Sequence, residues 1–121
     1  MKIRIYYEDT DAGGVVYHTN YIKYCERARS EKFFANNFTF DESGYFLVTK
    51  LDAKFIKPAK LGDIIEVKTK IALMKKASCT LEQTIYRDEE KLFVANITVA
   101  YMSNGKLSKI PEEKLSIFTR T

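Results

Sequence analysis

Four segments with the character of β-strands follow one another between residues 46 and 102, with no helical pattern between them. In the clearest, residues 64–74, Ile and Val on one phase alternate with Glu and Lys on the other, as in a half-buried strand. Residues 46–58, 78–86 and 92–102 are also rich in β-branched and aromatic residues,. Because their connections are short, we expect the four strands to form an antiparallel meander.

The apolar residues of the first three strands are expected to share the core face of the sheet. They are Leu47, Leu51, Ala53 and Phe55, then Ile65, Val67, Ile71 and Leu73, then Cys79, Leu81 and Ile85. Residues 92–102 are apolar on both phases, which predicts a central strand that is covered on both faces.

One amphipathic helix is predicted before these strands, from Asn20 to about residue 34. Thr19 or Asn20 has a side chain suited to capping its first turn. The residues that recur at the spacing of one helix face are Tyr21, Tyr24, Cys25 and Ala28,.

The remaining elements are short. Residues 2–7 are predicted to form a first strand, and residues 36–45 a loop,. Pro111, followed by two glutamates, favours a second helix that runs to about Phe118,. The chain of 121 residues is therefore expected to be one α+β domain over residues 1–121, a five-stranded antiparallel sheet with one main helix. A single helix cannot cover both faces of that sheet, so we expect a second subunit to cover the rest.

Composition narrows the class of protein. The net charge is +4 and the basic residues are scattered, which gives no specific indication of nucleic-acid binding. The two cysteines, Cys25 and Cys79, belong to no Cys-x-x-Cys pattern and are expected to be free thiols in a reducing compartment. No apolar run approaches the ~20 residues of a membrane span, and no signal peptide is recognised. These features predict a cytoplasmic protein.

The segment from Glu8 to His18 holds three carboxylates, two adjacent glycines and the chain's only histidine. Its Asp-x-Asp start resembles a Ca²⁺ loop, but Asn20 stands where such a loop needs a bidentate Glu. One histidine and two distant cysteines do not make a zinc site. No Gly-x-Ser-x-Gly motif is present, and the segment lacks the lysine of a phosphate-binding loop. From the incomplete calcium loop and the missing zinc ligands, we predict no metal site.

Two interpretations of these carboxylates remain. Asp9 and Asp11 are typical turn formers, which bond nearby backbone N–H groups. Alternatively, a carboxylate before a glycine turn that leads into a helix start lies beside unpaired N–H groups, a ready oxyanion site. The second interpretation makes chemistry on a carbonyl group plausible.

Residues 6–29, "YYEDTDAGGVVYHTNYIKYCERAR", closely resemble the signature of hotdog-fold acyl-CoA thioesterases. The resemblance is to the 4-hydroxybenzoyl-CoA thioesterase group, and most nearly to its YbgC-like branch. In many bacteria this branch is linked to the Tol–Pal envelope system. The segment "FIKPAKLGD" over residues 55–63 resembles a second, weaker marker of that family. The resemblance implies the hotdog fold, in which the sheet wraps around the long helix.

The resemblance also implies roles for individual residues. Asp11 corresponds to the catalytic carboxylate, as nucleophile or as general base, and the backbone N–H of His18 to the donor that polarises the thioester. The side chains of Tyr7 and His18 line the site in the YbgC-like branch. The residues implied in substrate binding are Gly14, Val16, Tyr17, Lys54, Lys57, Pro58 and Ala59.

The function implied is hydrolysis of acyl-CoA, with acyl carrier protein as another possible carrier, in a homotetramer built from two dimers. No cofactor is expected, because coenzyme A is part of the substrate. Two other functions stay open. One is a hotdog dehydratase of 3-hydroxyacyl thioesters, and the other is a non-catalytic acyl-thioester-binding protein or envelope-complex adaptor.

Overall fold

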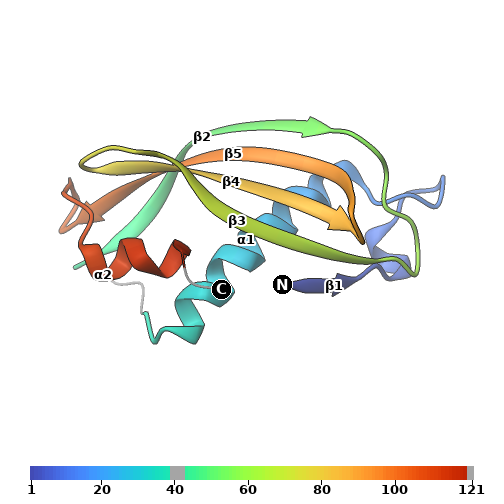
Figure 1. Ribbon diagram of the computed structural model, residues 1–121, viewed down its shortest axis with the longest axis horizontal. Helices are drawn as coiled ribbons and strands as arrows, with labels where there is room; N and C mark the ends of the chain where they lie inside the picture. The colour runs from blue at the N-terminus through green and yellow to red at the C-terminus, as the bar shows by residue number, and fades with distance from the viewer. Residues whose placement is uncertain (39–42, 120–121) are drawn as a thin grey trace.

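The computed structural model describes residues 1–38 and 43–119, so part of the loop predicted over residues 36–45 lies outside the described residues. A curled antiparallel sheet wraps around one long helix, α1 (Figure 1). The strands are β1 (Lys2–Arg4), β2 (Tyr45–Phe55), β3 (Ile64–Met74), β4 (Ser78–Arg87) and β5 (Glu90–Ser103), with a two-residue β6 (Lys106–Leu107) beside β5. The prediction of an α+β hotdog fold with a five-stranded antiparallel sheet and one long helix is confirmed.

The strand order is β1-β3-β4-β5-β2, which corrects the predicted meander. Of the four long strands, only β3, β4 and β5 follow one another as hairpins, and the short β6 continues from β5. β2 pairs with β5 from Tyr45↔Met102 to Phe55↔Phe93, and the chain then crosses the end of the sheet to begin β3 (Figure 1). The turn residues in "KLGD" show that the chain reverses there, but they do not specify which strand β2 pairs with.

Two β-bulges correct the predicted core face. The register of β2 shifts between Val48 and Lys50, so Leu47 lies opposite Ala100 while Leu51 lies opposite the buried Ile97. A similar shift in β3 pairs Leu73 with Thr80. Because side chains alternate between the faces of a strand, one extra residue moves every later side chain to the other face. Leu47 and Leu73 therefore point away from the core face.

The long helix α1 (His18–Ala35) starts two residues earlier than predicted. Its N-cap is Tyr17, which makes no side-chain cap bond, so the prediction of Thr19 or Asn20 as the cap is wrong. The Asn20 side chain instead donates from Nδ2 to the Asp9 carbonyl (2.9 Å). The predicted inner face is confirmed, since Tyr21, Tyr24, Cys25 and Ala28 are all buried.

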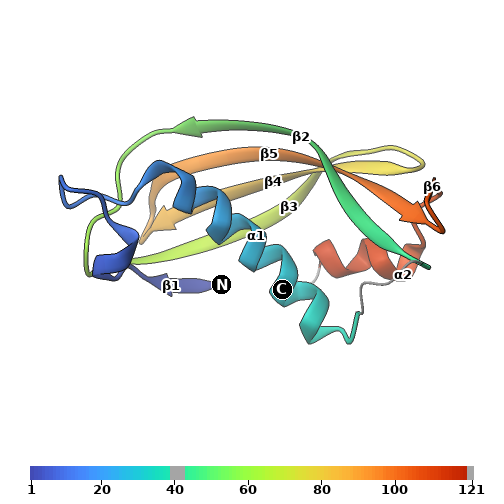
Figure 2. The same ribbon diagram turned by 180° about the vertical axis from the view of Figure 1, so that it is seen from behind.

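The chain ends of the described region also cover the core. β1 stops at Arg4, and Tyr7 belongs to a 3₁₀ turn, η1 (Tyr7–Asp9), instead of the predicted strand over residues 2–7. Near the other end, α2 (Glu112–Leu115) follows Pro111 as expected and continues into η2 (Ser116–Thr119). Ile117 and Phe118 of η2 are buried, and this segment lies beside α1 on the inner side of the sheet (Figure 2).

The two faces of β5 differ. Phe93, Ala95 and Ile97 face α1 and are buried, but Val94 on the other face is half-buried and Asn96 is exposed. The prediction that β5 is covered on both faces therefore does not hold within one chain. Cys79 and Cys25 are free and fully inside the core.

Candidate functional site

The loop between η1 and α1, residues 10–17, lies against the turn formed by residues 58–63. Val16 donates its N–H to the Ala59 carbonyl (2.9 Å), and isolated β-bridges join Val15 to Lys60 and Thr10 to Val16. The two family-like segments of the sequence, far apart along the chain, therefore meet at one end of the sheet.

Asp11 stands at the bend of this loop. Its Oδ1 accepts a hydrogen bond from the N–H of Gly13 (2.8 Å), its own N–H donates to the Val15 carbonyl (2.9 Å), and its carbonyl accepts from Gly14 (3.1 Å). Gly14 has a φ of 79°, a conformation that favours glycine. The turn thus engages one carboxylate oxygen, and Oδ2 has no hydrogen-bond partner among residues 1–38 and 43–119. Asp11 is exposed.

The first turn of α1 begins seven residues after Asp11. Tyr17 donates its N–H to the Asp9 carbonyl (3.0 Å), which fixes the residue before the helix. The N–H of His18 has no hydrogen-bond partner in the described part of the chain. Such N–H groups, at the positive end of the helix dipole, bind anions and developing negative charge. A carboxylate and an available N–H donor therefore belong to one short segment.

The other two carboxylates behave differently from Asp11. Asp9 accepts the N–H of Tyr6 at Oδ2 (2.8 Å), and its carbonyl holds the start of α1, so Asp9 is a structural turn residue. Burial, and then the nearby Asp9 carboxylate, raise the pKa of the Tyr24 hydroxyl, so this group stays neutral. Glu8 is exposed and forms no ion pair with the described residues.

Aromatic rings surround the helix start. The exposed His18 ring lies 4.6 Å from the ring of Tyr17 and 6.3 Å from that of Phe55. The His18 imidazole makes no hydrogen bond within the described residues, so it does not serve as a structural cap. Phe55 is half-exposed at the end of β2. Tyr7 is 82% exposed, and its ring contacts no other ring among the residues described.

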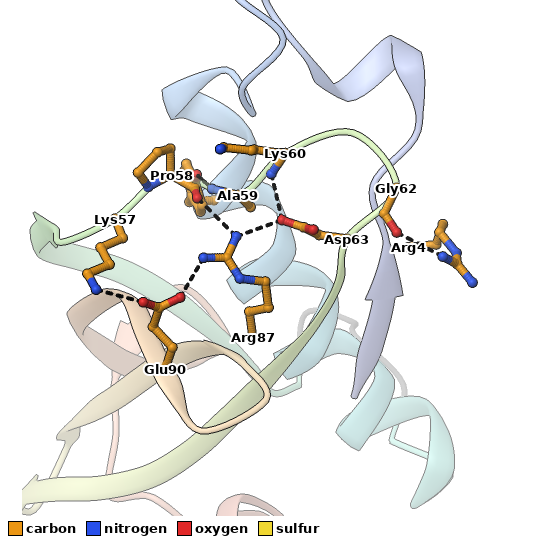
Figure 3. A network of polar contacts seen from close by, with 10 residues as sticks. Arg4, Lys57, Pro58, Ala59, Lys60, Gly62, Asp63, Arg87 and Glu90 are labelled. Atoms are coloured by element: carbon orange, nitrogen blue, oxygen red, sulfur yellow. Dashed lines mark hydrogen bonds and ion pairs between the residues drawn. The ribbon is translucent and has the colours of Figure 1, made fainter.

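Arg87, at the end of β4, joins the turn of residues 58–63 to the rest of the sheet (Figure 3). Its Nη1 donates to Asp63 Oδ2 (2.7 Å) and to the Pro58 carbonyl (3.3 Å). Its Nη2 donates to Glu90 Oε1, and the other oxygen of Glu90 accepts from Lys57 (2.7 Å). The sequence did not predict this network. The only local signal was the spacing of Arg87 and Glu90 in the turn "RDEEK".

The network changes the charge states around the turn. Partial burial raises the pKa of Asp63, but hydrogen bonds from the Lys60 N–H and from Arg87 outweigh it and hold that pKa below its ordinary value. Hydrogen bonds from Lys57 and Arg87 likewise lower the pKa of Glu90. Both carboxylates therefore stay ionised and paired well into the acid range.

The predicted substrate-binding residues fall into two groups. Gly14, Tyr17, Lys54 and Pro58 are exposed near this end of the sheet. Val16 and Ala59 are buried, Lys57 is paired with Glu90, and the backbone of Ala59 bonds to Val16 and to the Tyr21 hydroxyl. Whether any of them contacts substrate stays a prediction.

Two absences within residues 1–38 and 43–119 bear on the class of site. Over residues 1–38 and 43–119, no group of three or more His, Cys, Asp or Glu side chains is arranged to hold a metal ion. Among the helices described, none has the length and apolar character needed to cross a membrane.

Comparison with known proteins identifies the family. The model of the Thioesterase superfamily matches residues 13–94. The chain is 41% identical to the acyl-CoA thioesterase YbgC of Helicobacter pylori (strain ATCC 700392 / 26695), over 95% of this chain and 94% of the relative. It is 37% identical to YbgC of Haemophilus influenzae, over 98% and 92%. A probable thioesterase from Bartonella henselae superposes with a TM-score of 0.79 at 33% identity, covering 92% of this chain and 96% of that one. The chain therefore belongs to the thioesterase superfamily.

Proposed function

We propose that this protein hydrolyses acyl-CoA thioesters to the free acid and coenzyme A, with Asp11 as the catalytic carboxylate. The observation that carries the proposal is the exposed Asp11 carboxylate, with one free oxygen, on the loop that leads to the unpartnered N–H of His18. The names of the YbgC relatives support the reaction class. The roles of the individual residues are inferred from their position.

The chemistry needs little beyond these two groups. The N–H of His18 donates a hydrogen bond to the thioester oxygen and so stabilises the negative charge that develops there. Asp11 either attacks the carbonyl carbon, giving a mixed anhydride that water then cleaves, or removes a proton from water as it attacks. In both routes the carbon–sulfur bond breaks and the thiolate leaves without strong acid assistance, because thiol pKa values are near ~8.5.

Neighbouring side chains have supporting roles in this proposal. The His18 imidazole, which is free of protein hydrogen bonds, is placed to bond the substrate or the attacking water. Tyr7, exposed beside the same loop, lines the site. The half-exposed ring of Phe55 offers an apolar surface for the acyl group. Lys54, on the exposed face of β2, is available to the phosphates of coenzyme A, whereas Lys57 is neutralised by Glu90.

A homo-oligomer completes the site in this proposal. β2 is an edge strand whose Val48 and Phe55 face the α1 side of the sheet, yet they are 48% and 51% exposed. An exposed apolar edge strand is a template for pairing with another chain. We propose that two copies pair along β2 and that dimers associate into tetramers, which brings the site of one subunit against its neighbour. Two free thiols favour the cytoplasm as its location,.

The test is hydrolysis of a panel of acyl-CoA substrates, short aliphatic, long aliphatic and aromatic, by the purified protein. The same acyl groups on acyl carrier protein compare the two carriers. Turnover that Asp11→Asn abolishes would support the proposal. Binding of acyl-CoA without turnover would favour a non-catalytic binding protein, and hydration of a 2-enoyl thioester would favour a dehydratase.

A dilution series tests the oligomer. We expect specific activity and oligomer mass, measured by light scattering, to fall together as the protein is diluted. Val48→Lys should shift the equilibrium toward monomer, because it places a charge in the paired edge. A monomer with full specific activity would exclude a shared site.

A further inference from the structure

We infer that Arg87 is a positioning residue for the reaction, which holds the Asp11 loop in place through the turn of residues 58–63. This inference rests on the proposed role of Asp11. Arg87 lies on β4, remote in sequence from both segments, and it touches the turn without touching the loop (Figure 3).

The turn contacts both ends of the segment that carries Asp11. Before that segment, Ile5 donates its N–H to the Asp63 carbonyl (2.8 Å) and accepts from Gly62 (2.9 Å). After it, Val16 donates to the Ala59 carbonyl (2.9 Å). The position of residues 6–15 is therefore set largely by where this turn lies.

The turn also holds the helix that supplies the N–H of His18. Ala59 donates its N–H to the Tyr21 hydroxyl (2.9 Å), one turn into α1. Burial, partly offset by this hydrogen bond, raises the pKa of Tyr21, so the hydroxyl remains neutral and accepts the bond. The turn of residues 58–63 thus supports both the Asp11 carboxylate and the backbone N–H of His18.

Arg87 fixes the turn at its two ends with one planar group. Nη1 bonds the carbonyl of Pro58, where the turn begins, and the carboxylate of Asp63, where it ends, while Nη2 bonds Glu90. Asp63 also caps the Lys60 N–H (2.8 Å) inside the turn. The fork geometry of a guanidinium meets several acceptors at once, which a lysine ammonium does not reproduce.

The ion pair between Arg87 and Asp63 is partly buried, which strengthens it. The side chains of Arg87 and Asp63 are 26% and 24% exposed, so they are screened less than the exposed pair of Lys70 and Glu82, at 71% and 31%,. Displacements of about 1 Å at a reacting group cost up to about 10²-fold in rate. Loss of Arg87 should therefore reduce turnover more than it reduces substrate binding.

The experiment compares Arg87→Gln with Lys70→Gln in the full-length protein. Both changes remove one positive charge from a cross-strand ion pair, but only the first touches the turn. We expect Arg87→Gln to lower kcat about 10-fold or more with KM changed less than about 3-fold, at temperatures well below the Tm of each variant. Lys70→Gln should leave both constants within about 2-fold.

Two further variants separate positioning from stability. Arg87→Lys keeps the charge but not the fork, and we expect it to restore less than half of the lost kcat. Asp63→Asn combined with Arg87→Gln should be little worse than Arg87→Gln alone, because Arg87→Gln already removes the ion pair that the two residues share,. A lower Tm with unchanged kcat in Arg87→Gln would overturn the inference.

Amide hydrogen exchange measures how firmly the turn holds the Asp11 segment, independently of catalysis. The N–H groups of Ile5 and Val16 should exchange at least about 5-fold faster in Arg87→Gln and at the wild-type rate in Lys70→Gln. Faster exchange would still be seen if Asp11→Asn proved fully active. Failure of the proposed Asp11 mechanism can therefore be distinguished from failure of the inference about Arg87. Unchanged exchange at both amides would overturn the inference.

Discussion

The loop that carries Asp11 and the turn from Pro58 to Asp63 lie against each other but are held in different ways. Within the loop, the bonds are short-range, from Asp11 to Gly13, Gly14 and Val15. The turn is held by long side chains that reach it from other elements, Arg87 from β4 and Tyr21 from α1. The carboxylate of Asp11, the proposed catalytic group, is exposed, whereas Asp63 in the turn is half-buried and ion-paired.

This difference separates two tasks between adjacent segments. A carboxylate that must react cannot also be saturated by ion pairs, since each pairing lowers its basicity. The loop therefore leaves Asp11 largely free, and the turn supplies the rigidity. Removing the Asp11 carboxylate should therefore change the rate with little change in stability, whereas removing the ion-paired side chains of the turn should change stability as well.

The largest expected effect is that of Asp11→Asn. We expect kcat to fall at least ~10³-fold, because the amide is neither nucleophile nor base, with the Tm close to wild type. Steady-state hydrolysis of acyl-CoA and thermal melting check this. Asp9→Asn is the matched control and should cost far less, because Asp9 serves the Tyr6 N–H. Near-normal turnover in folded Asp11→Asn would rule out this mechanism.

His18→Ala should have the next largest effect. Because the imidazole bonds no protein group, its removal should leave the fold intact and reduce kcat about 10²-fold if it assists proton transfer. Activity within about 3-fold of wild type would remove the side chain from the mechanism and leave only its backbone N–H.

Gly14→Ala and Gly62→Ala compare loop and turn directly. Both glycines have positive φ, 79° and 89°, and an added Cβ would meet no atom within 4 Å at either site. Each alanine should therefore cost about 1–2 kcal/mol through backbone strain alone. Gly14 lies beside Asp11, so Gly14→Ala should also reduce kcat about 10-fold. Gly62→Ala should reduce kcat less, because its strain reaches Asp11 only through the turn. Equal kcat for the two variants would contradict the division between loop and turn.

The smallest effect concerns the pH dependence of stability. The folded pKa of Asp63 is below its unfolded value of about 3.9,. Its stabilisation is therefore fully present above that value and is lost as the pH falls through the folded pKa. Asp63→Asn should be less stable than wild type by about 1 kcal/mol at pH 7, and the gap should narrow toward pH 3. Urea denaturation at both pH values measures it. A gap that widens in acid would contradict the assignment.

Local patterns predicted much of this architecture. The spacing of Tyr21, Tyr24 and Cys25 identified the buried face of α1, and the alternation in residues 64–74 gave the bounds of β3. Pairing between distant strands has no local signature, so β2 was placed beside β3 instead of β5. The bulges in β2 and β3 have no local sequence signature either, and they turn Leu47 and Leu73 away from the core face.

The site was predicted unevenly for a similar reason. The Asp11 loop is contiguous in sequence, so its carboxylates, glycines and helix start were visible together. The support from Arg87 joins residues 24 positions or more apart at Asp63 and Pro58, and it becomes visible only once the sheet is assembled. The start of α1 was missed because no side chain caps it. Tyr17 precedes the helix without a side-chain cap bond, and the Asn20 side chain donates to the Asp9 carbonyl instead.

The buried cysteines have a practical consequence. Burial raises the pKa of the Cys25 thiol to about 12 and that of Cys79 to about 11, so neither forms the reactive thiolate near neutral pH. A chromogenic thiol reagent added to the folded enzyme should therefore report only the coenzyme A that hydrolysis releases. Because neither native thiol reacts, Glu8→Cys at this exposed position would provide a unique attachment point for a fluorophore beside the Asp11 loop.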